Sequence, residues 1–286
     1  MPRRHAAAAL LLGAGVVWLY AGVLTSLARQ WASDDDYSHG FFVIPLALYF
    51  AWERRERLRT APLRPSAWGA VLVAASLAVY LAGIAGAELF LTRVSLVGVL
   101  AGAMLFVWGR VHFRALLFTF AFLLLMIPLP AIVFNQVAFP LQLLASRVGE
   151  SAIAAAGIPV LREGNVLHLA HTNLEVAEAC SGIRSLVSLL MLAIVLGYFT
   201  DPRPGARAAL ALASVPIAIV ANAARVAGTG MLSHWMGAAA AEGFFHTFSG
   251  WLMFVVAFAG LVVAQRLIAC VHLGRRTGPR AVSVEA

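Results

Sequence analysis

Three residues in the C-terminal half of the sequence carry side chains that could perform covalent chemistry. Cys180, one of only two cysteines, lies in the segment Ala179-Cys180-Ser181-Gly182-Ile183-Arg184. Arg225 ends the segment Asn222-Ala223-Ala224-Arg225, and His246 lies among aromatic residues. A thiolate can attack a carbonyl, an imidazole can transfer protons and a guanidinium can stabilise an oxyanion. Together, these residue types predict acyl transfer through a thioester intermediate.

Each of the three residues also has an ordinary structural interpretation. A cysteine at a helix end often serves as a small apolar residue, and an arginine at the end of a membrane span often extends to the lipid headgroups. A histidine beside aromatic residues often lies at the membrane interface. The chemical interpretation therefore requires that the elements carrying these residues bring them to one face of the protein.

The composition indicates an integral membrane protein. Of the 286 residues, 62% are hydrophobic and only 12% are charged. A soluble domain contains about 45–50% apolar and about 25% charged residues. The net charge of +8 does not indicate a nucleic-acid partner, because the arginines lie in short loops between apolar runs, where they set the membrane topology.

The apolar runs predict eight membrane spans, because a span needs about 20 apolar residues. The spans are expected near residues 6–27, 38–52, 66–84, 91–109, 113–129, 181–199, 207–225 and 247–270. Five arginines between Arg54 and Arg64 place the end of the second span in the cytoplasm by the positive-inside rule. Both termini, including the tail at 271–286, are then cytoplasmic. Cys180, Arg225 and His246 lie at the outer ends of three consecutive spans.

The segment between the fifth and sixth spans is predicted to lie outside the cytoplasm. Gln142, Ser146 and Glu150 form one polar stripe at helical spacing, which predicts short amphipathic helices at the membrane interface, interrupted by Pro140. Residues 166–170 and 174–176 are expected to be strands around a turn at 171–173.

The expected fold class is an all-α polytopic membrane protein. It has about eight transmembrane helices, interfacial helices and a short extracytoplasmic β-hairpin before the cysteine helix. The chain is expected to form a single domain, 1–286, with its core at about 6–270.

The segment around Cys180 resembles the cysteine motif of the exosortase/archaeosortase family. Asn222-Ala223-Ala224-Arg225 is similar to the arginine motif of that family, and His246 falls where its histidine motif is expected. Tyr37-Ser38-His39-Gly40 is similar to its N-terminal motif, and the resemblance covers about residues 35–265.

The resemblance implies a membrane cysteine transpeptidase or protease in the bacterial inner membrane, with its active site on the periplasmic face. Its substrates would be secreted proteins that end in a Pro-Glu-Pro motif, a transmembrane helix and a basic cluster. Cys180 would be the nucleophile, His246 the acid and base, and Arg225 the oxyanion-stabilising group. The acyl group would pass to an acceptor, which this family associates with extracellular polysaccharide. Membrane lipids are the other expected partners, with a lipid as a further acceptor.

Seven further residues are candidates for substrate binding or support. Arg184 could pair with the glutamate of the substrate motif, or form a structural pair with Glu178 or Glu175. The remaining candidates are Ser181, Gly182, Asn222, Glu178, His39 and Tyr37.

No metal site and no cofactor is predicted. His168, His171 and Glu175 are of ligand type, but the sequence has no metalloprotease motif, and a hairpin would place these side chains on different faces.

Two other functions remain open. A transporter or polysaccharide-export component without covalent chemistry would carry ionisable residues near the middle of the membrane, whereas the predicted spans are nearly free of them. A membrane acyltransferase would use the same cysteine with a lipid donor.

Overall fold

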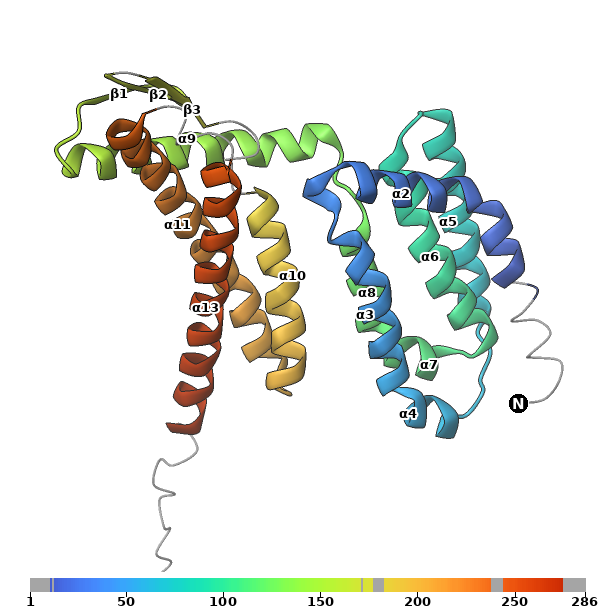
Figure 1. The fold of residues 1–286 in the computed structure, drawn as a ribbon. Coiled ribbons are helices and arrows are strands. Elements are labelled where there is room, and N and C mark those ends of the chain that lie inside the picture. The colour runs from blue at the N-terminus through green and yellow to red at the C-terminus, as the bar shows by residue number, and fades with distance from the viewer. Residues whose placement is uncertain (1–10, 12, 171, 177–182, 238–243, 275–286) are drawn as a thin grey trace, which may run out of the picture. The chain divides into compact units, whose positions relative to one another are not determined.

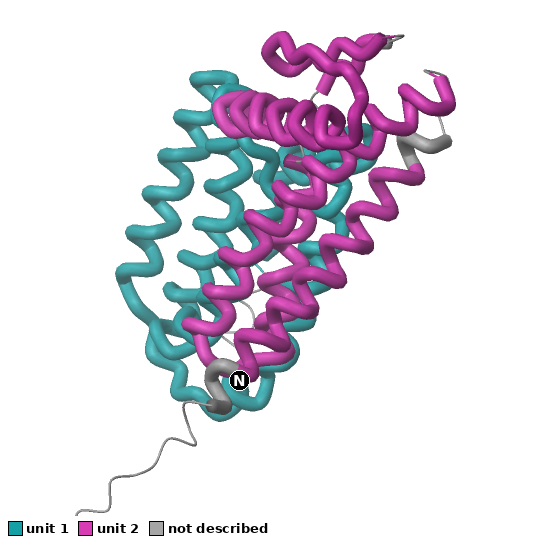
Figure 2. Tube along the Cα trace, turned by 90° about the vertical axis from the view of Figure 1, so that its left-hand side faces the viewer, with its two compact units in different colours: residues 1–133 teal, residues 134–286 magenta. Residues whose placement is uncertain are grey.

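The protein is mostly helical and forms two compact units. The computed structural model describes residues 11, 13–170, 172–176, 183–237 and 244–274. Unit 1 is Met1–Val133 and unit 2 is Phe134–Ala286, shown in two colours in Figure 2. This division does not test the prediction of a single domain, which stays a prediction.

Six helices among the described residues are long and apolar enough to cross a membrane, by length and composition. They are α5 (Ala67–Ala85), α6 (Leu89–Val107), α9 (Ala131–Ala155), α10 (Ile183–Thr200), α11 (Pro204–Met236) and the Phe248–Cys270 part of α13 (Phe244–Gly274). A multi-pass membrane protein is therefore confirmed, but the count of eight spans is not. The second predicted span corresponds to α3 (Gly40–Glu53), a helix of only 14 residues.

Unit 2 is built on three antiparallel helices, α10, α11 and α13 (Figure 1). Their shared core consists of apolar side chains at helical spacing: Leu189, Ala193, Leu210, Ala218, Ala257 and Leu261. In the turn between α10 and α11, Arg203 Nη2 lies 2.6 Å from Asp201 Oδ2. The hydrogen bonds that Arg203 donates to the Asp201 carboxylate raise the pKa of Arg203 above its usual value.

A helix and a small sheet cover one end of this bundle. The helix α9 runs across that end, and the strands β1 (Val160–Glu163), β2 (Val166–Leu169) and β3 (Thr172–Glu175) lie beyond it (Figure 1). The sheet is antiparallel, with strand order β1-β2-β3.

The predicted hairpin corresponds to β2 and β3, but two details of the prediction are wrong. A third strand, β1, precedes the hairpin, and Thr172 and Asn173, which the prediction assigned to the turn, belong to β3. Gly164 opens the turn between β1 and β2 with a φ of +64°, a value that favours glycine.

The prediction of several short helices in 131–156 is also wrong, because α9 is one continuous helix of 25 residues; its location at the membrane interface stays a prediction. Pro140 lies inside it. A proline removes one backbone hydrogen bond and often kinks a helix. Here the helix continues through it, and side chains on either side pack into the unit.

Unit 1 contains the α5–α6 hairpin, in which small residues allow close approach of the two helices (Figure 1). A Cβ atom at Gly102 would lie 2.8 Å from Val73 Cγ2, and one at Gly83 would lie 2.8 Å from Thr92 Cγ2. Two helices with such contacts pack with their backbones close together, as is common in membranes.

Two of the predicted spans in unit 1 differ from the helices observed. In place of a span ending at Leu27, a helix at 13–19 is followed by α2 (Ala21–Ser33). The predicted span at 113–129 is divided into α7 (Arg110–Ala115), α8 (Leu117–Leu123) and the short helix η2 (Leu124–Met126). Pro128 and Pro130 follow and cannot continue a helix.

The turn between α5 and α6 contains a strained residue. Ala87 has a φ of +52°. The Glu88 N–H donates to the Gly83 carbonyl at 2.7 Å and the Ala87 N–H donates to the Ile84 carbonyl at 3.2 Å. These two bonds form a Schellman helix end, in which the position of Ala87 is usually glycine because its φ is positive.

We expect Ala87→Gly to raise the free energy of unfolding by about 0.5–1 kcal/mol. A left-handed backbone costs an alanine roughly 1–2 kcal/mol, and glycine removes this strain. The greater conformational freedom of glycine in the unfolded chain offsets part of the stabilisation. The matched control Ala78→Gly, at an exposed position in the middle of α5, should lower the stability by roughly 0.5–1 kcal/mol. Thermal unfolding of the purified protein in detergent measures both, and equal destabilisation by the two variants would contradict the strain at Ala87.

Candidate functional site

Two helices begin at the end of unit 2 that carries the sheet, α10 and α13, and α11 continues past their first residues toward the sheet (Figure 1). Arg225 lies on α11, eleven residues before the last residue of that helix, so the prediction that the span ends at residue 225 is wrong. Position 246 lies in the first turn of α13. Cys180 and the side chain of His246 lie outside the described residues. The convergence of all three groups stays a prediction.

Arg225 packs directly against α13. Its Cζ atom lies 3.7 Å from where a Cβ atom on Gly250 would be. Gly250 follows position 246 by four residues, so the two positions share one face of the helix. The half-buried Arg225 therefore packs against the same face of the α13 backbone as position 246.

A small pocket of about 140 Å³ adjoins this contact. Thr229 and Leu232 of α11 line it together with Arg225, and Phe248, Ser249 and Leu252 of α13 line the opposite side. A permanently charged group beside such an apolar surface is weakly screened by water, so its interaction with a developing oxyanion is stronger than in bulk solvent.

The backbone of α11 near Arg225 is held by close packing. Val226 is 3% exposed and belongs to a cluster formed with α9 and the sheet, which includes Ile153, Leu167 and Val176. A Cβ atom at Gly149 of α9 would lie 2.8 Å from Val226 Cγ1. Because α9 and the sheet leave Val226 little room to move, they also fix the direction in which Arg225 leaves the helix.

The chain is anchored on both sides of the segment that contains Cys180. Before it, the Val176 N–H donates to the Asn165 carbonyl at 2.8 Å, and Asn165 Nδ2 donates to the Val176 carbonyl at 3.3 Å. After it, Ile183 is buried at the start of α10. The intervening candidates Glu178, Ser181 and Gly182 lie outside the described residues.

The polar stripe of α9 contacts the sheet. Ser146 Oγ donates to the Gly164 carbonyl at 3.0 Å, and the Glu150 carboxylate accepts a hydrogen bond from Arg162 Nε at 2.9 Å. The helical spacing of these residues was read correctly from the sequence. Two of the stripe residues position the sheet, a role that the sequence analysis missed.

Two supporting candidates in unit 2 are described. Asn222 is buried on α11, one turn before Val226, and is 5% exposed. Arg184 is exposed in the first turn of α10, and Glu175 is exposed on β3. A role for Arg184 in binding substrate stays a prediction.

The two ring nitrogens of His168 have partners within the sheet. Nδ1 lies 2.9 Å from Asn173 Oδ1, and Nε2 lies 3.4 Å from Glu163 Oε2. Among the described residues, no group of three histidine, cysteine or acidic side chains is arranged to hold a metal ion. His171 lies outside these residues.

Tyr37 and His39 belong to unit 1. His39 is 7% exposed, and its Nε2 donates to the Leu125 carbonyl at 3.1 Å, which ties the start of α3 to η2. The rings of Tyr37 and His39 have centroids 6.4 Å apart. These contacts give His39 a structural role in unit 1, and its contact with a substrate stays a prediction.

One buried charged residue was missed by the sequence analysis. Arg93, on α6, is only 3% exposed. The available signal was its position as a single charge within the apolar run predicted to span the membrane at 91–109. Such residues are rare in spans and often functional.

Comparison with known proteins gives one match. A family model described as transmembrane exosortase matches residues 31–263, a range that includes Cys180, Arg225 and His246. No curated protein and no solved structure matches the chain. Because the match covers most of the sequence, the chain belongs to the transmembrane exosortase family.

Proposed function

We propose that this protein is a cysteine transpeptidase or protease that removes the C-terminal sorting signal of secreted proteins. The family supports this class of activity. The observation that carries the proposal is the packing of Arg225 on Gly250, one helical turn after position 246 on α13.

In the proposed reaction, the thiolate of Cys180 attacks the carbonyl carbon of the scissile peptide bond near the Pro-Glu-Pro motif. Arg225 stabilises the oxyanion of the tetrahedral intermediate. As the C–N bond breaks, protonated His246 donates a proton to the leaving amine, and the tail departs. The thioester is then attacked by a hydroxyl group of water, a sugar or a lipid, whose proton passes to His246, and the Cys180 thiolate is released.

Chain connectivity supports the participation of Cys180. Val176 packs in the same cluster as Val226, the neighbour of Arg225. Four residues of extended chain reach at most about 14 Å, so Cys180 is tethered close to this cluster. A position near the first turn of α10 would also lower the pKa of a thiol through the helix dipole.

The proposed setting is the bacterial inner membrane, with both termini in the cytoplasm and the site on the periplasmic face. The arginines that follow α3 and those between α10 and α11 support this orientation. The proposed partners are the tailed substrates and a polysaccharide or lipid acceptor. A substrate tail anchored in the membrane would present its motif at the level of the helix ends described above.

We expect Cys180→Ala to abolish processing of a tailed reporter protein in cells, because no other group at this site can form the thioester. Cys270→Ala is the matched control: that cysteine is exposed near the end of α13 and should be dispensable. Immunoblotting of the reporter measures loss of the tail. Continued processing by the Cys180 variant would rule out the proposed nucleophile.

Arg225→Lys and His246→Gln should each reduce the rate of tail removal. Loss of one oxyanion-stabilising donor costs about 10²–10³ in kcat, and loss of an acid–base group about 10²–10⁴. Arg266→Lys is the control, because residue 266 lies roughly 24 Å along α13 from Gly250. Size-exclusion chromatography measures the amount of folded protein, and rates are compared at equal amounts. Unchanged rates in the two site variants would show that these residues have no chemical role.

Gly250→Leu is expected to displace the Arg225 guanidinium and reduce tail removal about 10²-fold, the usual cost of a misplacement of about 1 Å. Gly250→Ala should be tolerated, since its Cβ atom would make an ordinary contact at 3.7 Å. The ratio of the two rates in the reporter assay is the measurement. Full activity of Gly250→Leu, with normal folding, would contradict a positioning role for this contact.

A further inference from the structure

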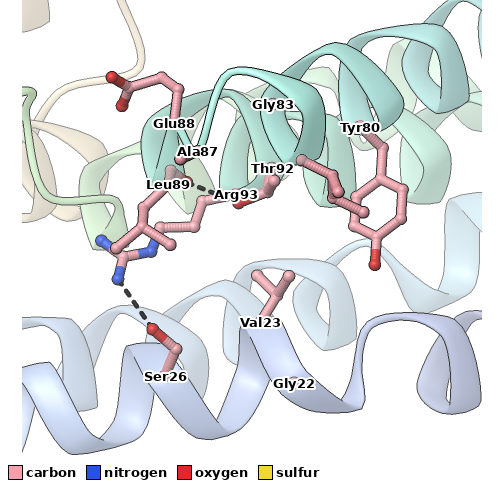
Figure 3. A pocket seen from close by; sticks show the side chains of 11 residues that line it. Gly22, Val23, Ser26, Tyr80, Gly83, Ala87, Glu88, Leu89, Thr92 and Arg93 are labelled. Atoms are coloured by element: carbon pink, nitrogen blue, oxygen red, sulfur yellow. Dashed lines mark hydrogen bonds between the residues drawn. The ribbon is translucent and has the colours of Figure 1, made fainter.

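Unit 1 contains a pocket of about 340 Å³ beside Arg93, here called the Arg93 pocket (Figure 3). It is lined by α2, by the end of α5 and by the start of α6. Gly22 and Ser26 line it from α2, Tyr80 from α5, and Thr92 and Arg93 from α6. None of these residues belongs to the candidate site in unit 2.

Arg93 carries a buried charge that the described residues neutralise poorly. Its Nη2 donates to the neutral Ser26 hydroxyl at 3.2 Å, as Figure 3 shows. Its Nε is buried and has no hydrogen-bond partner among the residues that the structure describes. Within the described parts of the chain, no carboxylate lies within ion-pair distance of this guanidinium. A buried guanidinium is stable only when its charge and its N–H groups are matched, so an anionic partner is expected.

The acidic residue nearest in sequence, Glu88, acts on Arg93 from a distance but forms no ion pair with it among the described residues. One of its carboxylate oxygens accepts a hydrogen bond from the Phe90 N–H at 3.0 Å and caps α6. In Figure 3 this carboxylate points away from the Arg93 guanidinium. Glu88 also lines the pocket, so its negative charge disfavours ligands with several negative charges.

The position of the pocket indicates a ligand that comes from the membrane. Arg93 lies near the start of α6, next to the polar loop at Glu88, which is the depth of the headgroups. Ile84 and Leu89 line the pocket and are 56% and 55% exposed on helices of membrane-spanning length. An arginine near the end of a span usually extends out to the headgroups. Here the side chain is buried, so a headgroup has to enter the pocket to reach it.

We propose that the Arg93 pocket binds the phosphate of a membrane phospholipid. The phosphodiester group, with its single negative charge, would pair with Arg93, and the acyl chains would lie along the exposed apolar side chains at the rim. Ser26 is a positioning residue, because its hydroxyl holds the guanidinium in the pocket.

The test uses the full chain in neutral detergent, titrated with phosphatidylglycerol and followed by native mass spectrometry. Diacylglycerol has the same acyl chains without the phosphate, and glycerol 3-phosphate has the phosphate without the chains. We expect phosphatidylglycerol to bind at least about tenfold more tightly than either. Diacylglycerol lacks the hydrogen-bonded charge, and glycerol 3-phosphate lacks the apolar contacts of the acyl chains.

Two variants locate the binding. Arg93→Gln removes the charge, and Gly22→Leu fills the pocket from α2, where a Cβ atom would have no neighbour within 4 Å. Both should weaken phosphatidylglycerol binding about tenfold or more. Gly15→Leu is the matched control: it lies on the preceding helix, is equally free of neighbours and should bind as the unaltered protein does. If Arg93→Gln does not fold, the affinity of the Gly22→Leu variant for phosphatidylglycerol is the deciding measurement.

Three results would overturn the proposal. Equal binding of diacylglycerol would show that the phosphate is not recognised. Equal binding of glycerol 3-phosphate would make the site one for a free phosphate rather than for a lipid. Undiminished phosphatidylglycerol binding by a folded Gly22→Leu variant would place the lipid elsewhere.

Discussion

The candidate site depends on the close packing of one end of α11 against α9 and the sheet. Val226 is enclosed there by side chains from both, and small residues such as Gly149 and Gly230 allow the approach. A Cβ atom at Gly230 would lie 2.5 Å from Ile153 Cδ1, so a larger residue would separate α11 from α9. This packing holds the backbone that carries Arg225, and through Val176 it also holds the chain that leads to Cys180.

The sheet in turn depends on polar contacts with α9. Ser146 is fully buried, and its hydroxyl donates to a carbonyl in the β1–β2 turn. Glu150 and Arg162 form a partly buried ion pair between the same helix and β1. Exposed ion pairs contribute little to stability, but the Ser146 hydroxyl is fully buried, so its hydrogen bond to the Gly164 carbonyl fixes the position of the turn against α9. These polar residues position the elements that lead to the site.

The two arginines illustrate different uses of charge in a membrane protein. Arg225 is half-buried at the end of a bundle, beside a pocket and against a glycine, where a guanidinium can interact with a transient negative charge. Arg93 is buried, and in the described part of the chain its hydrogen bond goes to the neutral Ser26 hydroxyl, an arrangement that favours a bound anion. Because moving a charge out of water is costly, neither arrangement is explained by packing alone.

The membrane class, the family, the hairpin and the helical stripe of α9 could all be predicted from the sequence, because each follows from local residue types and their periodicity. The motif around Cys180 and the motif positions of Arg225 and His246 could likewise be recognised from short stretches of sequence. The tertiary structure alone decided that Arg225 lies on Gly250, that Ser146 and Glu150 face the sheet, and that Arg93 is buried beside a pocket. These are contacts between residues far apart in the chain, and they depend on how helices and strands pack, which the spacing of residues along one element does not specify.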